Sequence, residues 1–474
     1  MKIKTKLLWC SSLLLLATLC AQKYFSNFEG FRSSLKQCAP YKPLQLDITF
    51  SHRKECLKIV CESQSTAETH INSEDTIDEI KIRGYNASSH TLLTKDGYYL
   101  TTHRISGGIN SPPRKGKTPV VLYHGHISAG ASWIIQPGSR NLAFTLVDAG
   151  YDVWLANSRG TSPSQKHISL DANKDIDYWN FDMAHLSTID LPLMIDQILQ
   201  ETGSEKIYYV CHSMGCAILL AGLSDVPELN DNIEASFLLA PPTHYGSNYN
   251  PIFLLFPPIL GTLWQDVWIR LMGGRLNTEP WAFTTALGIN TKQVCTWSFM
   301  RCGICDNLLF ALFGADPEQM DYNNLPNIMR KLMDSGAIKP FLHGLQINEA
   351  CAFPKYDHGS SQNILEYGSS KPPLYNMTGI TVPIYVFYGE NDNLVSPWDA
   401  ERLRNAIPEK FLRGFYKVEW PKFNHIDFVV AKDADILVYH KIRHIIQKLE
   451  DDNVCNLRQE CNSSTKSETN AEVK

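Results

Sequence analysis

An apolar strand that runs directly into a serine-containing turn and then into an apolar helix constrains this fold more than any other feature of the sequence. The strand is predicted over Lys206–Val210, the turn reads Cys211-His-Ser-Met-Gly215, and the helix follows over Gly215–Leu223. Such a turn holds a Ser hydroxyl at the carboxyl edge of a parallel sheet, where the free N–H groups of the helix start favour developing negative charge. The pattern indicates a nucleophile elbow centred on Ser213.

The first position of this turn, where glycine is usual, is occupied by Cys211. The residues two before and two after the nucleophile lie close together in an elbow, so a side chain at position 211 adds crowding. A buried serine that only caps a helix is the alternative interpretation. It would be favoured if Ser213 had no partners elsewhere in the chain.

Apolar strands and amphipathic helices alternate around the elbow, which predicts an α/β fold with a mostly parallel sheet and helices on both faces. Lys95-Asp-Gly97 predicts a hairpin turn ahead of the first unit. Besides the elbow, the predicted strands are His90–Thr94, Tyr98–Ile105, Pro119–Tyr123, Tyr151–Leu155, Ala235–Ala240, Val382–Tyr388 and Phe415–Trp420. The other predicted helices are Asn141–Ala149, His185–Thr202, Pro397–Ile407 and Asp433–Leu449.

The alternation stops after Pro241-Pro242 and resumes near residue 375, so one domain with a large helical insertion explains it better than two domains. The predicted division is a signal peptide at 1–21, a loosely structured leader at 22–77, the first part of the α/β-hydrolase core at 78–242, a cap or lid insertion at 243–375, the second part of the core at 376–450 and a polar tail at 451–474.

Composition excludes two broad classes. Hydrophobic residues make up 44% of the 474 residues and charged residues 20%, so the chain buries enough surface to exclude wholesale disorder. The net charge is −5 and no long Lys/Arg block occurs, which argues against nucleic acid as a partner. The chemistry is therefore expected to involve small molecules.

The N-terminus predicts entry into the secretory pathway. Lys2, Lys4 and Lys6 precede an apolar run, Leu7–Ala21, and small residues precede the polar Gln22. A retained signal anchor is the alternative, but a spanning helix needs about 20 apolar residues and this run is shorter. We expect cleavage, and no transmembrane span in the mature chain.

Cysteines and sequons fit an oxidising compartment. Cleavage would remove two of the thirteen cysteines and leave an odd number, so at least one thiol stays free or pairs between chains. Close spacing allows Cys56 with Cys61, Cys455 with Cys461, and Cys295 with Cys302 or Cys305. The predicted glycosylation sites are Asn86, Asn376 and Asn462.

A serine hydroxyl is a weak nucleophile until a neutral imidazole takes its proton and a carboxylate orients that imidazole. His425 lies in the loop after the last predicted strand, and Asp392 follows the strand before it. Asp399 and Glu390 are the reserve carboxylates. Because each group follows its own strand, the order Ser213, Asp392, His425 predicts an α/β-hydrolase triad.

The negative charge that develops in acyl transfer needs hydrogen-bond donors. The elbow offers the backbone N–H of Met214, and we expect a second donor from the loop His124–Ile127, where Gly125 permits close backbone approach. His124 itself can simply support that loop. His212 is adjacent to the nucleophile but is expected to project away from its hydroxyl.

A set of motifs in the same order resembles the acid lipases, the gastric and lysosomal lipase group, over roughly residues 76–450. The motifs are Tyr123–Gly125, Asp148–Gly160, Tyr209–Gly215, Leu239–Pro241, Tyr356–Ser360, Pro372–Asn376 and Asn424–Phe428. The resemblance implies hydrolysis of neutral lipid esters, triacylglycerols or cholesteryl esters, at a lipid–water interface. No cofactor is expected.

The resemblance also implies roles for individual residues. They are Ser213, Asp392 and His425 as the triad, and His126 and Met214 as the oxyanion donors. Family members usually carry Gly, Gln and Leu where this chain has Cys211, Met214 and His126, which bears on rate and substrate preference. The cap disulfide of the family would correspond to Cys295 with Cys305, although Cys302 leaves that pairing open.

The insertion opens with a strongly apolar stretch, Pro251–Trp264. It is not a spanning helix, because Pro257 and Pro258 interrupt it and Asp266 and Arg270 follow. One interpretation is a cap helix buried on the main sheet. The other, which the resemblance favours, is a cap and lid that receives acyl chains and exposes its apolar lining at a lipid surface.

Two rival functions stay open from the sequence: a carboxylesterase acting on soluble esters, and a catalytically silent lipid-binding homologue in which Cys211 has spoiled the elbow. A metal site is not expected, since no HExxH motif occurs. Cys302-Gly-Ile-Cys305 lacks a second close pair of ligands, which favours a structural disulfide there. Oligomeric state does not follow from the sequence.

Overall fold

A computed structural model of the chain describes residue 56 and residues 75–244, 262–276 and 305–453. Several predictions lie outside these residues: the signal peptide 1–21, most of the leader 22–77, Cys295, Asn462 and most of the tail 451–474. The opening stretch of the insertion, up to residue 261, also lies outside them.

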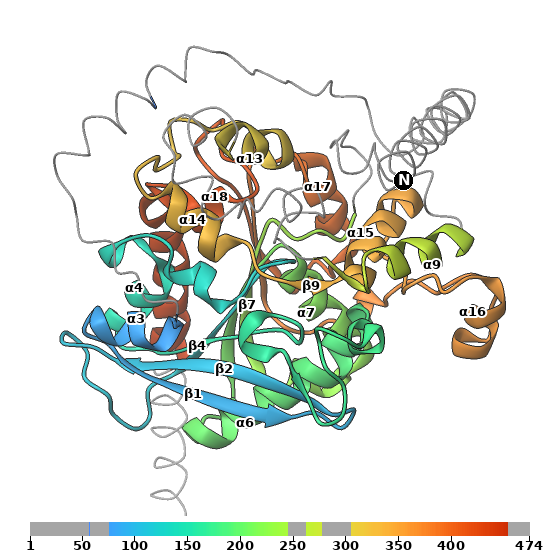
Figure 1. Ribbon diagram of the computed structural model, residues 1–474. Coiled ribbons are helices and arrows are strands. Elements are labelled where there is room, and N and C mark those ends of the chain that lie inside the picture. Colours follow the sequence, from blue (N-terminus) through green and yellow to red (C-terminus); the bar gives the residue numbers. More distant parts are fainter. Residues whose placement is uncertain (1–55, 57–74, 245–261, 277–304, 454–474) are drawn as a thin grey trace, which may run out of the picture.

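One mixed sheet organises the described residues, and the predicted α/β fold with a mostly parallel sheet and helices on both faces is confirmed (Figure 1). Its strands run in the order β1-β2-β4-β3-β6-β7-β10-β11, and β5 pairs with β2. Pairing is antiparallel from β1 through β4 and parallel from β4 through β11. The bounds are β1 Asn86–Leu93, β2 Tyr98–Gly107, β3 Pro119–Tyr123, β4 Asp152–Leu155, β5 Lys166–His167, β6 Ile207–His212, β7 Ile233–Leu239, β10 Ile384–Tyr388 and β11 Leu412–Lys417.

The central strands are apolar throughout because both faces of the sheet are covered. Along β3, Val120 and Leu122 belong to one hydrophobic cluster, whereas Val121 and Tyr123 belong to another. Since successive side chains of a strand point to opposite faces, the two clusters are the two sides of the sheet. Strand β6, which leads into the elbow, is buried at every position.

Helices divide between these two faces (Figure 1). Helix α4 and the C-terminal helical residues 440–453 pack on one face, and α6, α7 and α17 pack on the other. The helices of the core are α3 Thr76–Ile82, α4 Leu142–Asp148, α5 Met183–His185, α6 Leu191–Thr202, α7 Met214–Asp225, α17 Pro397–Ala406 and α18 Asp427–Val430.

Most predicted boundaries lie within two residues of the observed ones because local signals set them. The Asn141 side chain accepts the N–H of Phe144 at 2.9 Å and caps α4, and Gly203 ends α6 at φ 66°. Three predictions were wrong. Strand β1 begins at Asn86 instead of His90. Strand β11 begins at Leu412 instead of Phe415, and the acidic stretch assigned to the leader forms α3, which Asp75 caps.

The insertion lies against the edge of the sheet that carries the elbow. Its described elements are α9 Thr262–Leu271, β8 Arg275–Leu276, α13 Asp306–Phe313, α14 Leu325–Leu332, β9 Gly336–Ala337, α15 Ile338–Ala350 and α16 Ser360–Tyr367. The N–H of Asp334 donates to the carbonyl of Ile127 at 2.7 Å, and the N–H of His425 donates to the carbonyl of Phe313 at 3.2 Å. Two separate parts of the insertion therefore contact the two loops that flank the elbow.

The position of helix α9 bears on the interpretation that the start of the insertion is a cap helix buried on the main sheet. Ile269 packs with Ile338 and Leu342 of α15, so this side of α9 rests on the insertion itself. Val267 and Leu271 are exposed on the same helix. None of the helices in the described ranges combines the length and apolarity needed to cross a membrane.

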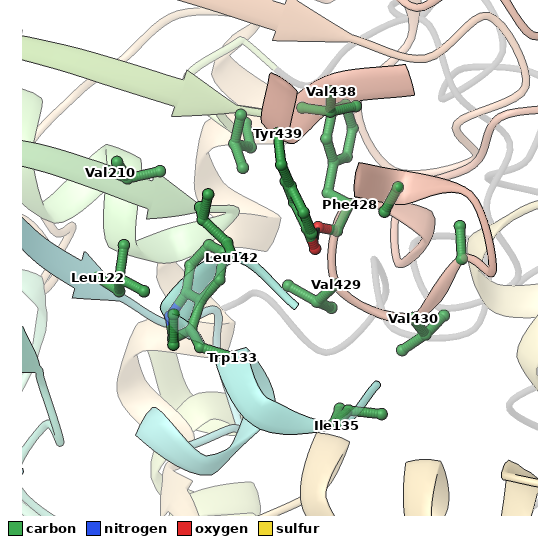
Figure 2. Packing of buried hydrophobic residues seen from close by; sticks show 14 of the residues in the cluster. Leu122, Trp133, Ile135, Leu142, Val210, Phe428, Val429, Val430, Val438 and Tyr439 are labelled. Carbon is green, nitrogen blue, oxygen red and sulfur yellow. Dashed lines mark hydrogen bonds between the residues drawn. The ribbon is translucent and has the colours of Figure 1, made fainter. Parts of the chain in front are cut away.

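A tightly packed apolar cluster supports the loop that carries His425 (Figure 2). Trp133, Leu142 and Val429 lie around the ring of Tyr439. The Tyr439 hydroxyl donates to the backbone carbonyl of Phe428 at 2.6 Å, and both side chains are buried. This bond ties the C-terminal helical region to the segment just after His425.

Replacing Tyr439 by Phe should lower the free energy of unfolding by about 1–2 kcal/mol, because a buried carbonyl loses its donor while the ring packing stays. Urea unfolding followed by circular dichroism measures this change. Tyr367→Phe is the matched control: its hydroxyl also donates to a carbonyl, that of Tyr356, at a partly exposed position. Equal losses in both variants would show that burial of the Phe428 carbonyl is not what matters.

Candidate active site

Ser213 occupies the turn between β6 and α7 in a backbone conformation that L-residues rarely adopt, with φ 52° and ψ −127°. Its N–H donates to the carbonyl of Leu239 at 2.9 Å, and its own carbonyl accepts the N–H of Cys216 at 2.8 Å. Such strain costs about 1–3 kcal/mol and persists only where the surroundings enforce it. The turn thus holds the hydroxyl at the carboxyl edge of the sheet.

Gly215 allows this turn to close. A Cβ at this position would stand 2.6 Å from the carbonyl oxygen of His124 and 2.8 Å from the ring of Tyr123. No side chain fits at that distance from backbone, so β3 and the start of α7 can meet only at a glycine.

A continuous chain of hydrogen bonds joins the predicted nucleophile, base and acid. The Ser213 hydroxyl donates to Nε2 of His425 at 2.8 Å, and Nδ1–H of His425 donates to Oδ2 of Asp392 at 2.8 Å. Because a carboxylate only accepts, it fixes the proton on Nδ1 and leaves Nε2 free to accept. All three side chains are buried, with 9% of Ser213 exposed.

Asp392 is oriented by backbone donors from the segment that follows it. Its Oδ1 accepts the N–H groups of Leu394 and Val395, each at 2.7 Å, which leaves Oδ2 for the imidazole. The reserve carboxylates lie elsewhere. Asp399 forms a capping box with Ser396 at the start of α17, and Glu390 pairs with Lys417 at the surface.

His425 is held in place from two sides. Its N–H donates to the carbonyl of Phe313 at the end of α13, and the Phe313 ring stacks on the imidazole with centroids 6.0 Å apart. On the other side, Nε2–H of His212 donates to the carbonyl of His425 at 2.8 Å. Burial, reinforced by the neighbouring His425, lowers the pKa of His212 to about 3, so it stays a neutral donor.

His212 was not among the predicted site residues, and the prediction that it projects away from the hydroxyl did not suggest a role. Its position directly before Ser213 was the available signal. A side chain there points to the opposite side of the strand end from its neighbour. Only the folded structure shows that this side meets the carbonyl of His425.

A pair of buried carboxyl groups supports the same loop. Each of Asp316 and Asp427 shifts the pKa of the other, and the buried Oδ1 atoms of both accept no N–H or O–H from the described residues. A proton held between the two carboxyl groups satisfies both oxygens. Asp427 Oδ2 also accepts the N–H of Asn424 at 2.7 Å, and Asp316 Oδ2 accepts the indole N–H of Trp420 at 2.7 Å. Burial raises the pKa of Asp316 to about 6, and burial together with the charge of Asp316 raises the pKa of Asp427 well above its usual range.

The loop after β3 lies directly against the nucleophile. A Cβ on Gly125 would stand 3.1 Å from the Ser213 Cβ, so the backbone of this loop passes close beside the Ser213 side chain. His124 supports the loop: its Nδ1–H donates to the carbonyl of Gly125 at 2.7 Å, and its Nε2 accepts the N–H of Ser158 at 3.1 Å. The His126 ring stacks on Phe341 of α15.

Met214 is the first residue of α7, where N–H groups have no partner inside the helix. The backbone of His126 reaches the same end of the sheet through the loop that contacts Ser213. The assignment of these two N–H groups as oxyanion donors stays a prediction.

Cysteines and sequons have mixed outcomes. Cys305 is disulfide-bonded, but its predicted partner Cys295 lies outside the described residues. The structure also joins Cys211 to Cys216, a pairing that the sequence did not suggest. Asn86 and Asn376 are both exposed, as attachment of a glycan requires, and glycosylation there stays a prediction.

Within the described ranges, no group of three or more His, Cys, Asp or Glu side chains could hold a metal ion.

Comparison with family models gives two matches. The model described as alpha/beta hydrolase fold matches residues 118–419, and the model described as partial alpha/beta-hydrolase lipase region matches residues 76–137. Together they span both halves of the core and the segment that leads into it.

Curated relatives are similar over most of their length. Lipase 3 of Drosophila melanogaster is 32% identical over 79% of this chain and 93% of its own. Gastric triacylglycerol lipase of Rattus norvegicus is 34% identical over 76% and 88%, and lysosomal acid lipase/cholesteryl ester hydrolase of Homo sapiens is 31% identical over 81% and 92%. Among solved structures, a monoglyceride lipase variant of Saccharomyces cerevisiae matches with a TM-score of 0.47 and 14% identity, covering 77% of this chain and 96% of its own.

Replacing His212 by Ala should slow the phosphonylation of Ser213 by a fluorophosphonate roughly ten- to hundredfold, because the imidazole of His425 loses an anchor and small displacements in such sites cost that much. His212→Gln keeps an N–H donor and should restore part of the rate. His103→Ala, which removes another buried histidine from β2, is the control and should label like the wild type. Normal labelling of His212→Ala would exclude the anchoring role.

The carboxyl pair should make the folded protein less stable as pH rises. Because the pKa of Asp316 is raised on folding, the folded state holds a proton that the unfolded state loses, so stability falls between about pH 4 and pH 6. Asp316→Asn removes this ionisation and should raise stability at pH 7 by about 2 kcal/mol while changing little at pH 4.

Thermal unfolding at both pH values measures the effect. Glu409→Gln, which neutralises an exposed carboxylate that is not among the groups shifting the pKa of Asp316, is the control and should leave the pH dependence unchanged. Equal pH dependence in wild type and Asp316→Asn would contradict the account of the pair.

Proposed function

Because the chain belongs to the lipases of the α/β-hydrolase family, we propose that it hydrolyses carboxylic esters of neutral lipids through a covalent acyl-enzyme on Ser213. The observation that carries this proposal is the buried chain of two 2.8 Å hydrogen bonds from Ser213 through His425 to Asp392. It supplies a nucleophile, a base and the group that orients the base.

The reaction follows from the positions of these groups. His425 Nε2 takes the hydroxyl proton as Ser213 Oγ attacks the ester carbonyl carbon, and the carbonyl oxygen becomes an oxyanion. The backbone N–H groups of Met214 and His126 are the proposed donors to that oxyanion. When the carbon–oxygen bond to the alcohol breaks, His425 returns the proton to the departing alcohol and the acyl group stays on Ser213.

Water completes the cycle. His425 takes a proton from a water molecule as its oxygen attacks the acyl carbon, and the proton then passes to Ser213 Oγ as the fatty acid leaves. Asp392 stabilises the imidazolium that forms in each half and keeps the proton of Nδ1 in place. All of these proton transfers use groups of this chain and water.

The insertion supports a lipid substrate over a soluble one. Six of the eight residues of helix α13, Asp306–Phe313, are apolar, all except Asp306 and Asn307. The helix runs from the exposed Leu308 to Phe313, whose ring stacks on the imidazole of His425. An apolar helix that extends from the surface to the imidazole suits contact with an acyl chain. The curated relatives named as triacylglycerol and cholesteryl ester hydrolases support the same substrate class.

We also infer that the protein works in the secretory pathway, either outside the cell or in the lysosome. The predicted signal peptide, the exposed sequon residues Asn86 and Asn376, and the disulfide between Cys211 and Cys216 support this location. The relatives named as gastric and lysosomal lipases fit both destinations.

Hydrolysis of a short-chain triacylglycerol below and above its solubility limit tests the substrate class. The rate should rise when the ester forms droplets, because an apolar cap gains most from a lipid surface. Emulsified long-chain triacylglycerol and cholesteryl ester should be hydrolysed as well, at acidic or at neutral pH. Ser213→Ala is the control and should abolish hydrolysis of every ester.

A rate that saturates below the solubility limit, with no hydrolysis of the emulsions, would instead support a carboxylesterase acting on soluble esters. Absence of hydrolysis of any ester by the wild type would contradict the enzymatic proposal and leave the silent lipid-binding homologue.

A further inference from the structure

Two cysteines enclose the nucleophile in sequence and are bonded to each other in the structure. Cys211 stands one residue before the end of β6, and Cys216 lies in the first turn of α7. Their Cα atoms are 5.1 Å apart, within the usual span of a disulfide, and both side chains are fully buried. The cross-link therefore bridges the strand and the helix on either side of Ser213.

We propose that this disulfide is a positioning device for Ser213, an inference that rests on the proposed function. The residues inside the cross-linked loop are the ones that the site depends on: His212 anchors the loop of His425, Ser213 is the nucleophile, and Met214 offers an oxyanion donor. Fixing the distance between residues 211 and 216 restrains all three at once.

The backbone at Ser213 explains why a covalent restraint matters here. Its φ of 52° is unfavourable for a serine, so the turn relaxes unless its two ends are held. The bonds from the Ser213 N–H to Leu239 and from the Cys216 N–H to Ser213 restrain the same turn, and both depend on β6, β7 and α7 keeping their places. The disulfide adds a restraint that does not weaken when the helix moves.

The disulfide also relieves the steric crowding that a side chain at position 211 is expected to cause in the turn. Bonded sulfur atoms sit about 2.05 Å apart, whereas non-bonded atoms need roughly 3.5 Å or more. The bond thus lets the side chains of Cys211 and Cys216 both fit between β6 and α7. In most such turns the residue at the position of Cys211 is glycine, which has no side chain to fit. Two free thiols would have to separate, and the ends of the turn would shift with them.

Formation of the bond is a two-electron oxidation. The thiols of Cys211 and Cys216 lose two protons and two electrons, and a disulfide of a thiol oxidoreductase accepts them and becomes two thiols. Because both sulfur atoms are buried after folding, this exchange belongs to the folding of the chain in an oxidising compartment. The finished cross-link is then protected from reductants.

A thiol map of the secreted, full-length protein tests whether the bond exists. The protein is unfolded in denaturant with iodoacetamide and without reductant, and the peptide that carries residues 211–216 is examined by mass spectrometry. We expect this peptide without alkylation and lighter by two hydrogen atoms than after reduction. Alkylation of both residues would overturn the proposal.

Variants test whether the bond positions the nucleophile. Cys211→Ala, Cys216→Ala and the double variant should each lower kcat for a short-chain ester, and the rate of phosphonylation of Ser213, by the same roughly tenfold or more, with KM little changed. The effects should not add, because each variant removes the same bond. Ile195→Val, a core truncation in α6, is the control for general destabilisation and should keep kcat.

Each outcome separates this inference from the proposed function. Wild-type rates in the double variant, or losses that add between the two single variants, would overturn the positioning role while leaving the enzyme intact. If the variants do not fold, the thiol map of the wild type still decides whether the bond exists. A wild type that does not label at Ser213 would overturn the proposed function, and this inference with it, whatever the thiol map finds.

Discussion

The strained backbone of Ser213 is the constraint on which the rest of the site depends. A φ of 52° directs the hydroxyl out of the carboxyl edge of the sheet, and this conformation is unfavourable for a serine. It survives because β6 is buried on both faces, because Gly215 lets α7 approach the backbone of His124, and because Cys211 and Cys216 are joined across the turn. The sheet and its helices are thus rigid enough to keep Ser213 in this unfavourable conformation.

The imidazole partner reaches Ser213 through a different kind of support. Its loop has little secondary structure of its own, so it is held by the end of α13, by His212 from the elbow, and by the carboxyl pair of Asp316 and Asp427. Two of these supports, α13 and Asp316, come from the insertion. The insertion therefore helps to build the site, because its residues fix the loop that carries the imidazole.

The sequence predicted the parts of this structure that local signals determine. Strand β3 and helix α4 were recognised because an apolar run and the residues Asn141 and Gly150 mark their ends, and the fold class followed from their alternation. Ser213, Asp392 and His425 could be proposed together because each follows its own strand. The sequence could not reveal that His212 meets the carbonyl of His425, or that Asp316 meets Asp427, because those contacts join segments far apart in the chain. Cys216 was missed for another reason: its pairing depends on the direction of the first turn of α7.

The central claim is that the hydroxyl of Ser213 is made nucleophilic by the imidazole of His425. Peptide mapping after reaction with a fluorophosphonate measures this most directly, with the rate of labelling compared between wild type and His425→Ala. We expect the phosphonyl group on Ser213 in the wild type, and we expect labelling of His425→Ala to be slower by about a thousandfold or more. Labelling of a different residue, or equal rates in the two proteins, would contradict this claim.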